Sequence, residues 1–106
     1  MKIKNVALAL AIAACLGSVQ AAPVKIGFVT TLTTGGAVIG TDMQNAVNLA
    51  MEHLGSKAGN TELKVIFADD GLKPETGKQA TDRLVKEDKV DFVAGYIWSE
   101  ASVCKV

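Results

Sequence analysis

The chain has 106 residues, with 11 basic and 11 acidic side chains, so its formal net charge is zero. This balance gives no electrostatic attraction for nucleic acid or anionic lipid. Two cysteines and one histidine are present, and Cys15 falls in a predicted leader segment. The remaining Cys104 and His53 are too few for an internal disulfide or a zinc site, so we expect no metal and no cofactor.

Residues 1–21 are typical of a secretory signal peptide. Lys2 and Lys4 provide a charged start, residues 6–14 form an apolar run, and VQA at 19–21 is a small-x-small cleavage sequence. The apolar run is too short to span a bilayer. We therefore expect cleavage after Ala21, export, and a mature segment 22–106 with 9 basic and 11 acidic residues, a net charge of −2. A lipoprotein signal is the alternative, since IAAC at 12–15 resembles a lipobox ending at Cys15.

The mature segment alternates short apolar strands with helix-length stretches. Strands are expected at residues 24–29, 62–68 and 90–94, each followed by residues that favour turns. A helix is expected over 42–54, with Thr41 as its N-cap and Gly55 after its end. The apolar face of this helix is predicted to comprise Met43, Val47, Ala50 and Leu54.

The second helix is expected over residues 74–87, beginning at Pro74, with an inner face of Ala80, Leu84 and Val85. Residues 56–61 are interpreted as a polar connector. The resulting βαβαβ order predicts an α/β half-domain with a parallel sheet, strand order 2-1-3, and the two helices on opposite faces. The loops after strands 1 and 3 then flank the topological switch point, where open α/β sheets bind ligands.

The loop after strand 1 holds Thr33, Thr34, Gly35 and Gly36 before a helix. One interpretation is a cradle whose backbone N–H groups and hydroxyls receive a carboxylate. The alternative is an ordinary turn that needs glycine for its backbone angles. The segment is neither a P-loop nor a dinucleotide-binding fingerprint, because no Lys-Ser/Thr follows Gly40 and GxGxxG is missing.

The loop after strand 3 contains Tyr96, Trp98 and Ser99. In the functional interpretation Ser99 holds a polar ligand group and an aromatic ring lines the pocket. The alternative is a core tryptophan and a solvent-facing tyrosine. The pair Asp69-Asp70 is interpreted as a strand-ending turn. No nucleophile–base pair is found around His53 or elsewhere, so the chain is not expected to be an enzyme.

Residues 24–99 resemble the start of a type I periplasmic binding protein. The similar segments are VKIGFVTTLTTGGAVIGTDMQNAVNLAMEHL, ELKVIFADDGLKPETGKQATDRLVKED and KVDFVAGYIWS, in the family's order and spacing. The subgroup that they resemble is the branched-chain amino acid (Leu/Ile/Val) substrate-binding component of ABC transporters.

The resemblance implies a periplasmic, two-lobed receptor that closes over a small ligand, delivers it to an inner-membrane permease and performs no chemistry. It also implies ligand contacts from Ser99 and from Thr33, Thr34, Gly35, Gly36 and Ala37, with Tyr96 and Trp98 in the pocket by position. GYIWS is similar to relatives that take up aromatic or other small carboxylates, so the implied ligand is an amino acid or such a carboxylate. The alternative is the same fold as a ligand-sensing domain of a receptor.

The sequence departs from the family pattern in three respects. Trp98 stands where Leu/Ile/Val binders can carry a cysteine of the first-lobe disulfide, and the tail EASVCKV does not continue the family's helix pattern. The chain also corresponds only to part of the first lobe. We therefore expect the 106-residue product by itself to bind poorly or to fold with low stability.

Overall fold

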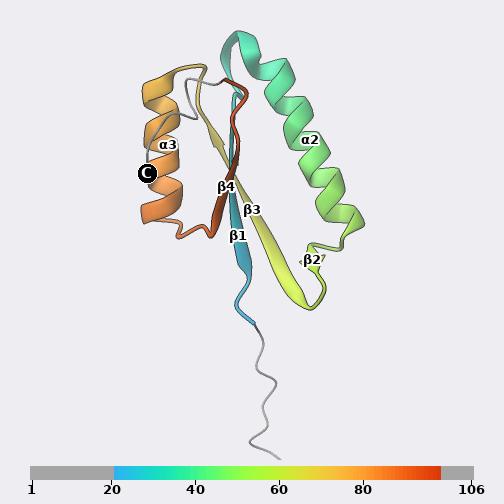
Figure 1. The fold of residues 1–106 in the computed structure, drawn as a ribbon. Helices are drawn as coiled ribbons and strands as arrows, with labels where there is room; N and C mark the ends of the chain where they lie inside the picture. Colours follow the sequence, from blue (N-terminus) through green and yellow to red (C-terminus); the bar gives the residue numbers. More distant parts are fainter. Residues whose placement is uncertain (1–20, 99–106) are drawn as a thin grey trace, which may run out of the picture.

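The computed structural model describes residues 21–98, so Cys15, Ser99 and Cys104 lie outside the described part. Strands and helices alternate as expected from the sequence (Figure 1). In chain order the elements are β1 (Val24–Thr30), the 3-10 turn η1 (Thr34–Gly36), α2 (Ala37–His53), β2 (Lys57–Ala58), β3 (Thr61–Asp69), α3 (Pro74–Lys86) and β4 (Phe92–Gly95).

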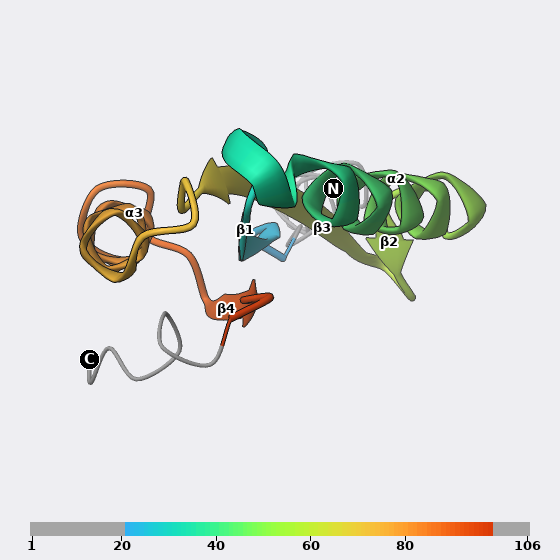
Figure 2. The same cartoon turned by 90° about the horizontal axis from the view of Figure 1, so that it is seen from above.

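The sheet has the order β2-β3-β1-β4, and β1 pairs in parallel with both β3 and β4. The predicted order 2-1-3 is therefore confirmed by β3-β1-β4. The helices α2 and α3 cover opposite faces, as Figure 2 shows. The expected polar connector at 56–61 instead contains β2, which pairs antiparallel with the start of β3.

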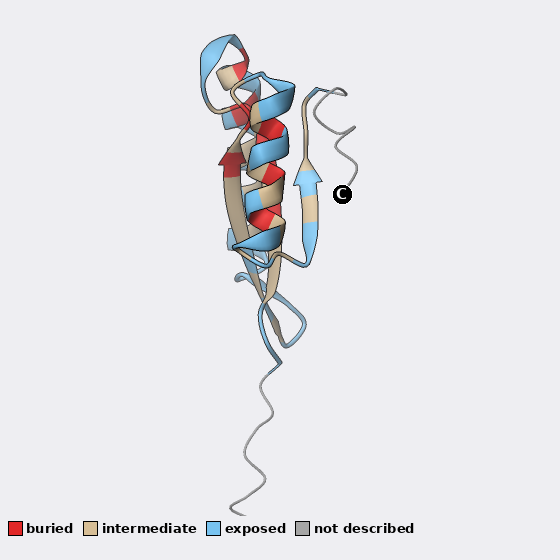
Figure 3. Ribbon diagram, turned by 90° about the vertical axis from the view of Figure 1, so that its left-hand side faces the viewer, coloured by how far each residue is buried: buried red, intermediate tan, exposed pale blue. Residues whose placement is uncertain are grey.

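The core lies between the sheet and α3. Val29, Ala68 and Leu84 are buried there, and Leu84 is fully inaccessible. Figure 3 shows the buried residues of α3 as a stripe on the helix. Ala80 packs against this core as well, so Ala80 and Leu84 of the predicted inner face are confirmed, whereas Val85 is half-buried and does not belong to the core cluster. Complete burial of a leucine side chain contributes about 2 kcal/mol, so Leu84 is a main attachment of α3 to the sheet.

The helix α2 begins at Ala37, five residues earlier than expected, so the predicted N-cap Thr41 lies inside the helix. Close packing explains the difference. A β-carbon at Gly40 would lie 1.6 Å from the carbonyl oxygen of Thr31, so the first turns of α2 rest directly on the end of β1. The sequence pattern indicated a glycine-rich loop, whereas Gly40 allows close approach of two backbones.

The predicted apolar face of α2 is only half correct. Met43 and Val47 are partly buried, whereas Ala50 and Leu54 are exposed. The helix contacts η1 and β1. Its later turns diverge from β1 (Figure 1), and apolar side chains near the end of α2 are exposed. The predicted end of the helix at Gly55, which adopts φ +62°, is confirmed.

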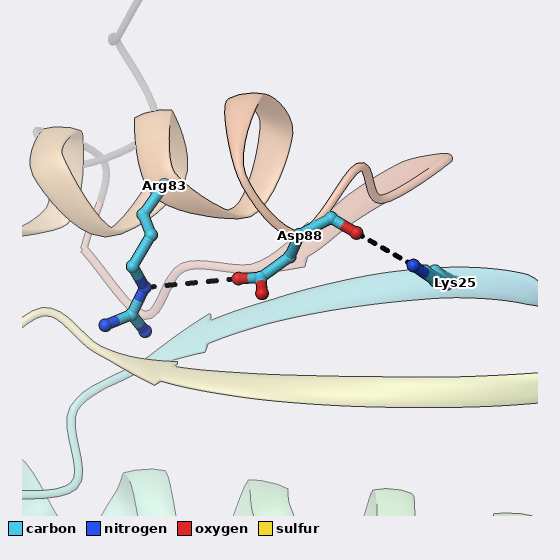
Figure 4. A network of polar contacts seen from close by, with 3 residues as sticks. All are labelled: Lys25, Arg83 and Asp88. Carbon is cyan, nitrogen blue, oxygen red and sulfur yellow. Dashed lines mark hydrogen bonds and ion pairs between the residues drawn. The ribbon is translucent and has the colours of Figure 1, made fainter.

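The turn between α3 and β4 is held to β1 by polar contacts. Lys25 Nζ donates to the carbonyl oxygen of Asp88 at 3.1 Å, and Arg83 Nε lies 4.0 Å from Asp88 Oδ2 (Figure 4). The backbone N–H of Lys25 donates to Asp91 Oδ2 at 2.9 Å. With Asp91 engaged in this turn, β4 begins at Phe92, two residues later than expected.

Candidate functional site

The loops that follow β1, β3 and β4 meet at the carboxyl edge of the sheet, the upper end in Figure 1. The backbone N–H of Asp70 donates to the carbonyl oxygen of Thr30 at 3.0 Å, and that of Tyr96 donates to the carbonyl oxygen of Val29 at 2.7 Å. Two consecutive carbonyls of β1 therefore hold the first residues of both neighbouring loops. This is the crevice position predicted from the topology.

Asp69 fixes the loop after β1. Its Oδ1 accepts hydrogen bonds from the backbone N–H groups of Leu32 at 2.8 Å and Gly71 at 2.9 Å, and its Oδ2 accepts from the Thr33 hydroxyl at 2.6 Å. Burial alone would raise the pKa of Asp69, but the hydrogen bonds from Thr33, Leu32 and Gly71 outweigh it and lower the pKa below its usual value. Asp69 is therefore an ionised carboxylate that accepts hydrogen bonds from the loop after β1 and from the loop after β3.

Asp70 lies deeper, with a relative exposure of 1%. Its Oδ1 accepts from the Thr31 hydroxyl at 2.6 Å and from the backbone N–H of Leu72 at 2.9 Å. Its Oδ2 is buried and has no hydrogen-bond partner among the described residues. Thr31 Oγ1 in turn accepts from Trp98 Nε1 at 3.3 Å. One chain of hydrogen bonds thus links all three loops.

The predicted residues of the first loop lie at the start of α2. Thr33, Thr34 and Gly35 are exposed, whereas Gly36 is buried against Thr31. Ala37 opens the helix, and no side chain caps the helix N-terminus. The first N–H of α2, that of Ala37, is paired with the carbonyl oxygen of Thr34 in η1, so the attraction of this helix end for an anionic group comes from the helix dipole.

The second loop brings one aromatic side chain to the core and leaves the other partly exposed. The Tyr96 ring packs against the core, and its hydroxyl lies 2.6 Å from that of Thr81 on α3. Trp98 is 41% exposed and is attached through its indole nitrogen. The alternative of a core tryptophan and a solvent-facing tyrosine is therefore wrong. Ser99 lies outside the described residues.

Glycine is required at the end of β4. Gly95 has φ +102°, and a β-carbon at this position would lie 2.2 Å from the carbonyl oxygen of Val29. The next residue, Tyr96, has φ +59°, an uncommon value for a residue with a side chain. The sharp change of direction after β4 thus follows from a glycine that sequence reasoning placed only as a turn residue.

A hollow of about 580 Å³ lies between β3 and α3. Its lining comprises Leu32, Phe67, Ala68, Asp69, Thr76, Gln79, Ala80 and Arg83. None of the predicted ligand-binding residues lines this hollow, so it is not the predicted crevice. Within residues 21–98, no cluster of three or more His, Cys, Asp or Glu residues is placed to hold a metal ion. No helix in the same range is long and apolar enough to cross a membrane.

Sequence reasoning missed the roles of Thr31, Asp69 and Asp70. The acidic pair was interpreted as a strand-ending turn, which is confirmed but incomplete, because both carboxylates also bind the loop after β1. A signal was available in the sequence. Strands 1 and 2 were predicted to be neighbours, so polar residues directly after each strand lie at the same edge of the sheet.

The fold and this edge define an α/β lobe of the ligand-binding type. A protein-family model described as "Periplasmic binding protein" matches residues 23–103. The chain therefore belongs to the periplasmic binding protein family, which confirms the resemblance found in the sequence. No curated protein matches the chain.

Solved structures agree with this assignment. A solute-binding protein of an ABC transporter from Rhodopseudomonas palustris BisB5, in complex with 3,4-dihydroxybenzoic acid, is 28% identical with a TM-score of 0.74, covering 77% of this chain and 23% of that chain. The branched-chain amino acid transporter substrate-binding protein LivJ from Streptococcus pneumoniae, in complex with isoleucine, is 26% identical with a TM-score of 0.70, covering 76% and 24%.

A possible leucine/isoleucine/valine-binding protein from Rhodopirellula baltica SH 1 is 26% identical with a TM-score of 0.72. It covers 84% of this chain and 25% of its own chain. The present chain thus spans about a quarter of the length of these three structures. The matched relatives are solute-binding proteins, and they include amino acid and aromatic acid binders.

Proposed function

We propose that the chain contributes part of the first lobe of an exported solute-binding protein, which binds a small carboxylate and delivers it to an inner-membrane ABC permease without chemical change. The observation that carries the proposal is the meeting of the three loops at the carboxyl edge, beside an N-terminus of α2 that no side chain caps. The ligand is either an amino acid of the branched-chain type or an aromatic acid.

The carboxylate is the better supported part of the proposed ligand. Isoleucine and 3,4-dihydroxybenzoic acid, bound by two relatives, share a carboxylate and an apolar body. Here the carboxylate would lie near Thr33, Thr34 and Gly35, while Trp98 would contact the apolar body. Ser99 would add its hydroxyl from the loop after β4. Tyr96 would act mainly by shaping this loop, because its own hydroxyl is paired with Thr81.

The test is calorimetric titration with two matched pairs of compounds. Isoleucine is compared with 2-methylbutylamine, which lacks the carboxylate, and 3,4-dihydroxybenzoate is compared with catechol. For the full-length gene product, we expect saturable binding of one of the two acids. The matched compound without the carboxylate should not bind. The 106-residue chain alone should bind at least tenfold more weakly, because the described loops contact a ligand from one side only. Equal binding of acid and partner would overturn the carboxylate assignment.

Export has its own test. We propose cleavage after Ala21, so the protein recovered from the periplasm should begin at Ala22 by mass spectrometry. A lipid-modified N-terminal Cys15 in the membrane fraction would instead establish the lipoprotein alternative.

A further inference from the structure

We propose that Asp70, acting through Thr31, fixes the orientation of the Trp98 side chain at the ligand-facing edge of the lobe. The inference deepens the proposed function and rests on it only where ligand affinity is concerned. The one-way order of hydrogen bonds carries the argument. The Thr31 hydroxyl has one proton, which it donates to Asp70 Oδ1 at 2.6 Å. The hydroxyl oxygen therefore acts as the acceptor of the hydrogen bond from Trp98 Nε1.

The two inner groups of this link are shielded from solvent. Thr31 is fully inaccessible and Asp70 is 1% exposed, so water does not compete for the hydroxyl. Hydrogen bonds in such dry surroundings are electrostatically stronger than those at the surface. Trp98 is 41% exposed although its nitrogen is bonded to this buried hydroxyl. The indole is therefore anchored at its nitrogen and presents part of its ring to solvent.

A turn after β3 does not by itself require this arrangement. The hydrogen bond from the Leu72 N–H to Asp70 Oδ1 would close the turn equally well if the carboxylate were at the surface. Instead the carboxylate is buried and its Oδ2 has no partner among the described residues, which is unfavourable for stability. The position of Asp70 is thus explained by its contact with Thr31 across to the loop after β1.

A preoriented aromatic ring makes binding easier, because its side-chain freedom is not lost when the ligand arrives. Immobilising one such side chain costs roughly 3- to 10-fold in affinity. Asp70 and Thr31 are therefore positioning residues, and Trp98 is the group that touches the ligand.

The test uses the indole N–H of Trp98, which is the single tryptophan of this chain and gives one assignable NMR signal. Thr31→Val keeps the side-chain shape but removes the hydroxyl, and it should speed hydrogen exchange of the indole N–H at least threefold. Thr31→Ser restores the hydroxyl and should return exchange to the wild-type rate. Asp70→Leu removes the acceptor of the Thr31 hydroxyl and should speed indole exchange as Thr31→Val does, and unchanged exchange in this variant would show that Asp70 does not act on Trp98. Asp70→Asn keeps a carbonyl oxygen for Thr31 and Leu72 and should leave the exchange rate close to wild type.

Thr81→Val is the matched control. It removes a buried hydroxyl that pairs with Tyr96, and it should lower the melting temperature without changing exchange at Trp98. This control separates loss of the specific link from a general loss of stability. If Thr31→Val and Thr81→Val change indole exchange equally, or if neither changes it, the proposed link is wrong.

The binding arm uses isoleucine and 3,4-dihydroxybenzoate as probes, on the longest product of the gene. Thr31→Val should lower the affinity for whichever probe binds by roughly 3- to 10-fold, and Thr31→Ser should restore this affinity. Faster indole exchange with unchanged affinity would overturn the positioning role. If neither probe binds wild-type protein, the proposed ligand class fails, and the exchange rates of the Thr31 variants still decide whether the link exists.

Discussion

The carbonyl oxygen of Thr31 occupies the space that a side chain at Gly40 would need. A β-carbon at Gly40 would lie 1.6 Å from that oxygen, closer than any non-bonded contact allows. The second turn of α2 therefore rests on the first residue after β1. This contact sets the position of the loop over residues 33–37, because the loop must connect two segments whose backbones touch.

We predict that Gly40→Ala destabilises the protein by about 3 kcal/mol or more. The added β-carbon would clash with the carbonyl oxygen of Thr31, and no rotamer change can relieve a clash with a backbone atom. Gly35→Ala is the control from the same loop. A β-carbon at Gly35 meets nothing within 4 Å, so its effect should stay within about 0.5 kcal/mol. Urea denaturation of both variants measures the difference. Similar stabilities would show that α2 is not packed on Thr31 as described.

The β-sheet topology could be predicted from the sequence because it depends on patterns along the chain. Short apolar runs, turn residues and the intervening helical stretches were sufficient to give the order β3-β1-β4 and helices on both faces. The handedness of parallel crossovers left few alternatives. These features need no knowledge of which side chains meet.

The start of α2 could not be predicted, because it depends on a contact between segments. Gly36 and Gly40 look like loop residues, and only the approach of Thr31 shows why they are glycine. For Asp69 and Asp70, the predicted strand order placed them at the same edge as the residues after β1, but it did not show which side chains pair. Their partners Thr31 and Thr33 lie more than 35 residues away in the sequence. Neither helical nor strand periodicity carries information on such pairs.

Stability should fall in acid because of Asp69. Its pKa is lower in the folded protein than in the unfolded chain, so the carboxylate stabilises the fold above about pH 4, the usual range for an unfolded aspartate. This contribution is lost as the pH falls through the folded-state pKa. Thr33→Val removes the hydroxyl donor at 2.6 Å and should reduce the loss of stability in acid.

Chemical denaturation at a series of pH values between 2 and 6 measures this effect. Thr76→Val is the control, since Thr76 makes no hydrogen bond to Asp69. It should leave the pH dependence as in wild type. If Thr33→Val gives the same profile as wild type, the Thr33 hydroxyl does not stabilise the Asp69 carboxylate.

The two aromatic residues after β4 should respond differently to substitution. Tyr96→Phe removes the hydroxyl that pairs with Thr81 at 2.6 Å and should cost about 1 kcal/mol of stability with little effect on ligand affinity. Trp98→Leu should cost little stability but weaken ligand binding at least tenfold, because Trp98 is partly exposed at the carboxyl edge. Thermal melts and titration of both variants separate the roles, and a binding loss confined to Tyr96→Phe would reverse the assignment.

The outer surface of β4 should promote self-association of the 106-residue chain. Phe92 is 64% exposed, and within residues 21–98 its strand pairs only with β1. Exposed apolar edge strands favour pairing with other chains. Phe92→Thr, which keeps a residue suited to strands, should raise the monomer fraction in light scattering coupled to gel filtration and change stability by less than about 0.5 kcal/mol.

Phe67→Thr is the matched substitution on a covered strand. Phe67 is partly buried and meets the Phe28 ring edge-on at a centroid distance of 5.7 Å, so its loss should cost about 2 kcal/mol or more. Folded Phe67→Thr protein should associate to the same extent as wild type, because the exposed Phe92 side chain is unchanged. If Phe92→Thr associates as strongly as wild type, contacts other than the β4 edge hold the copies together, and the exposed apolar residues Val38 and Ile39 at the start of α2 become the next positions to substitute.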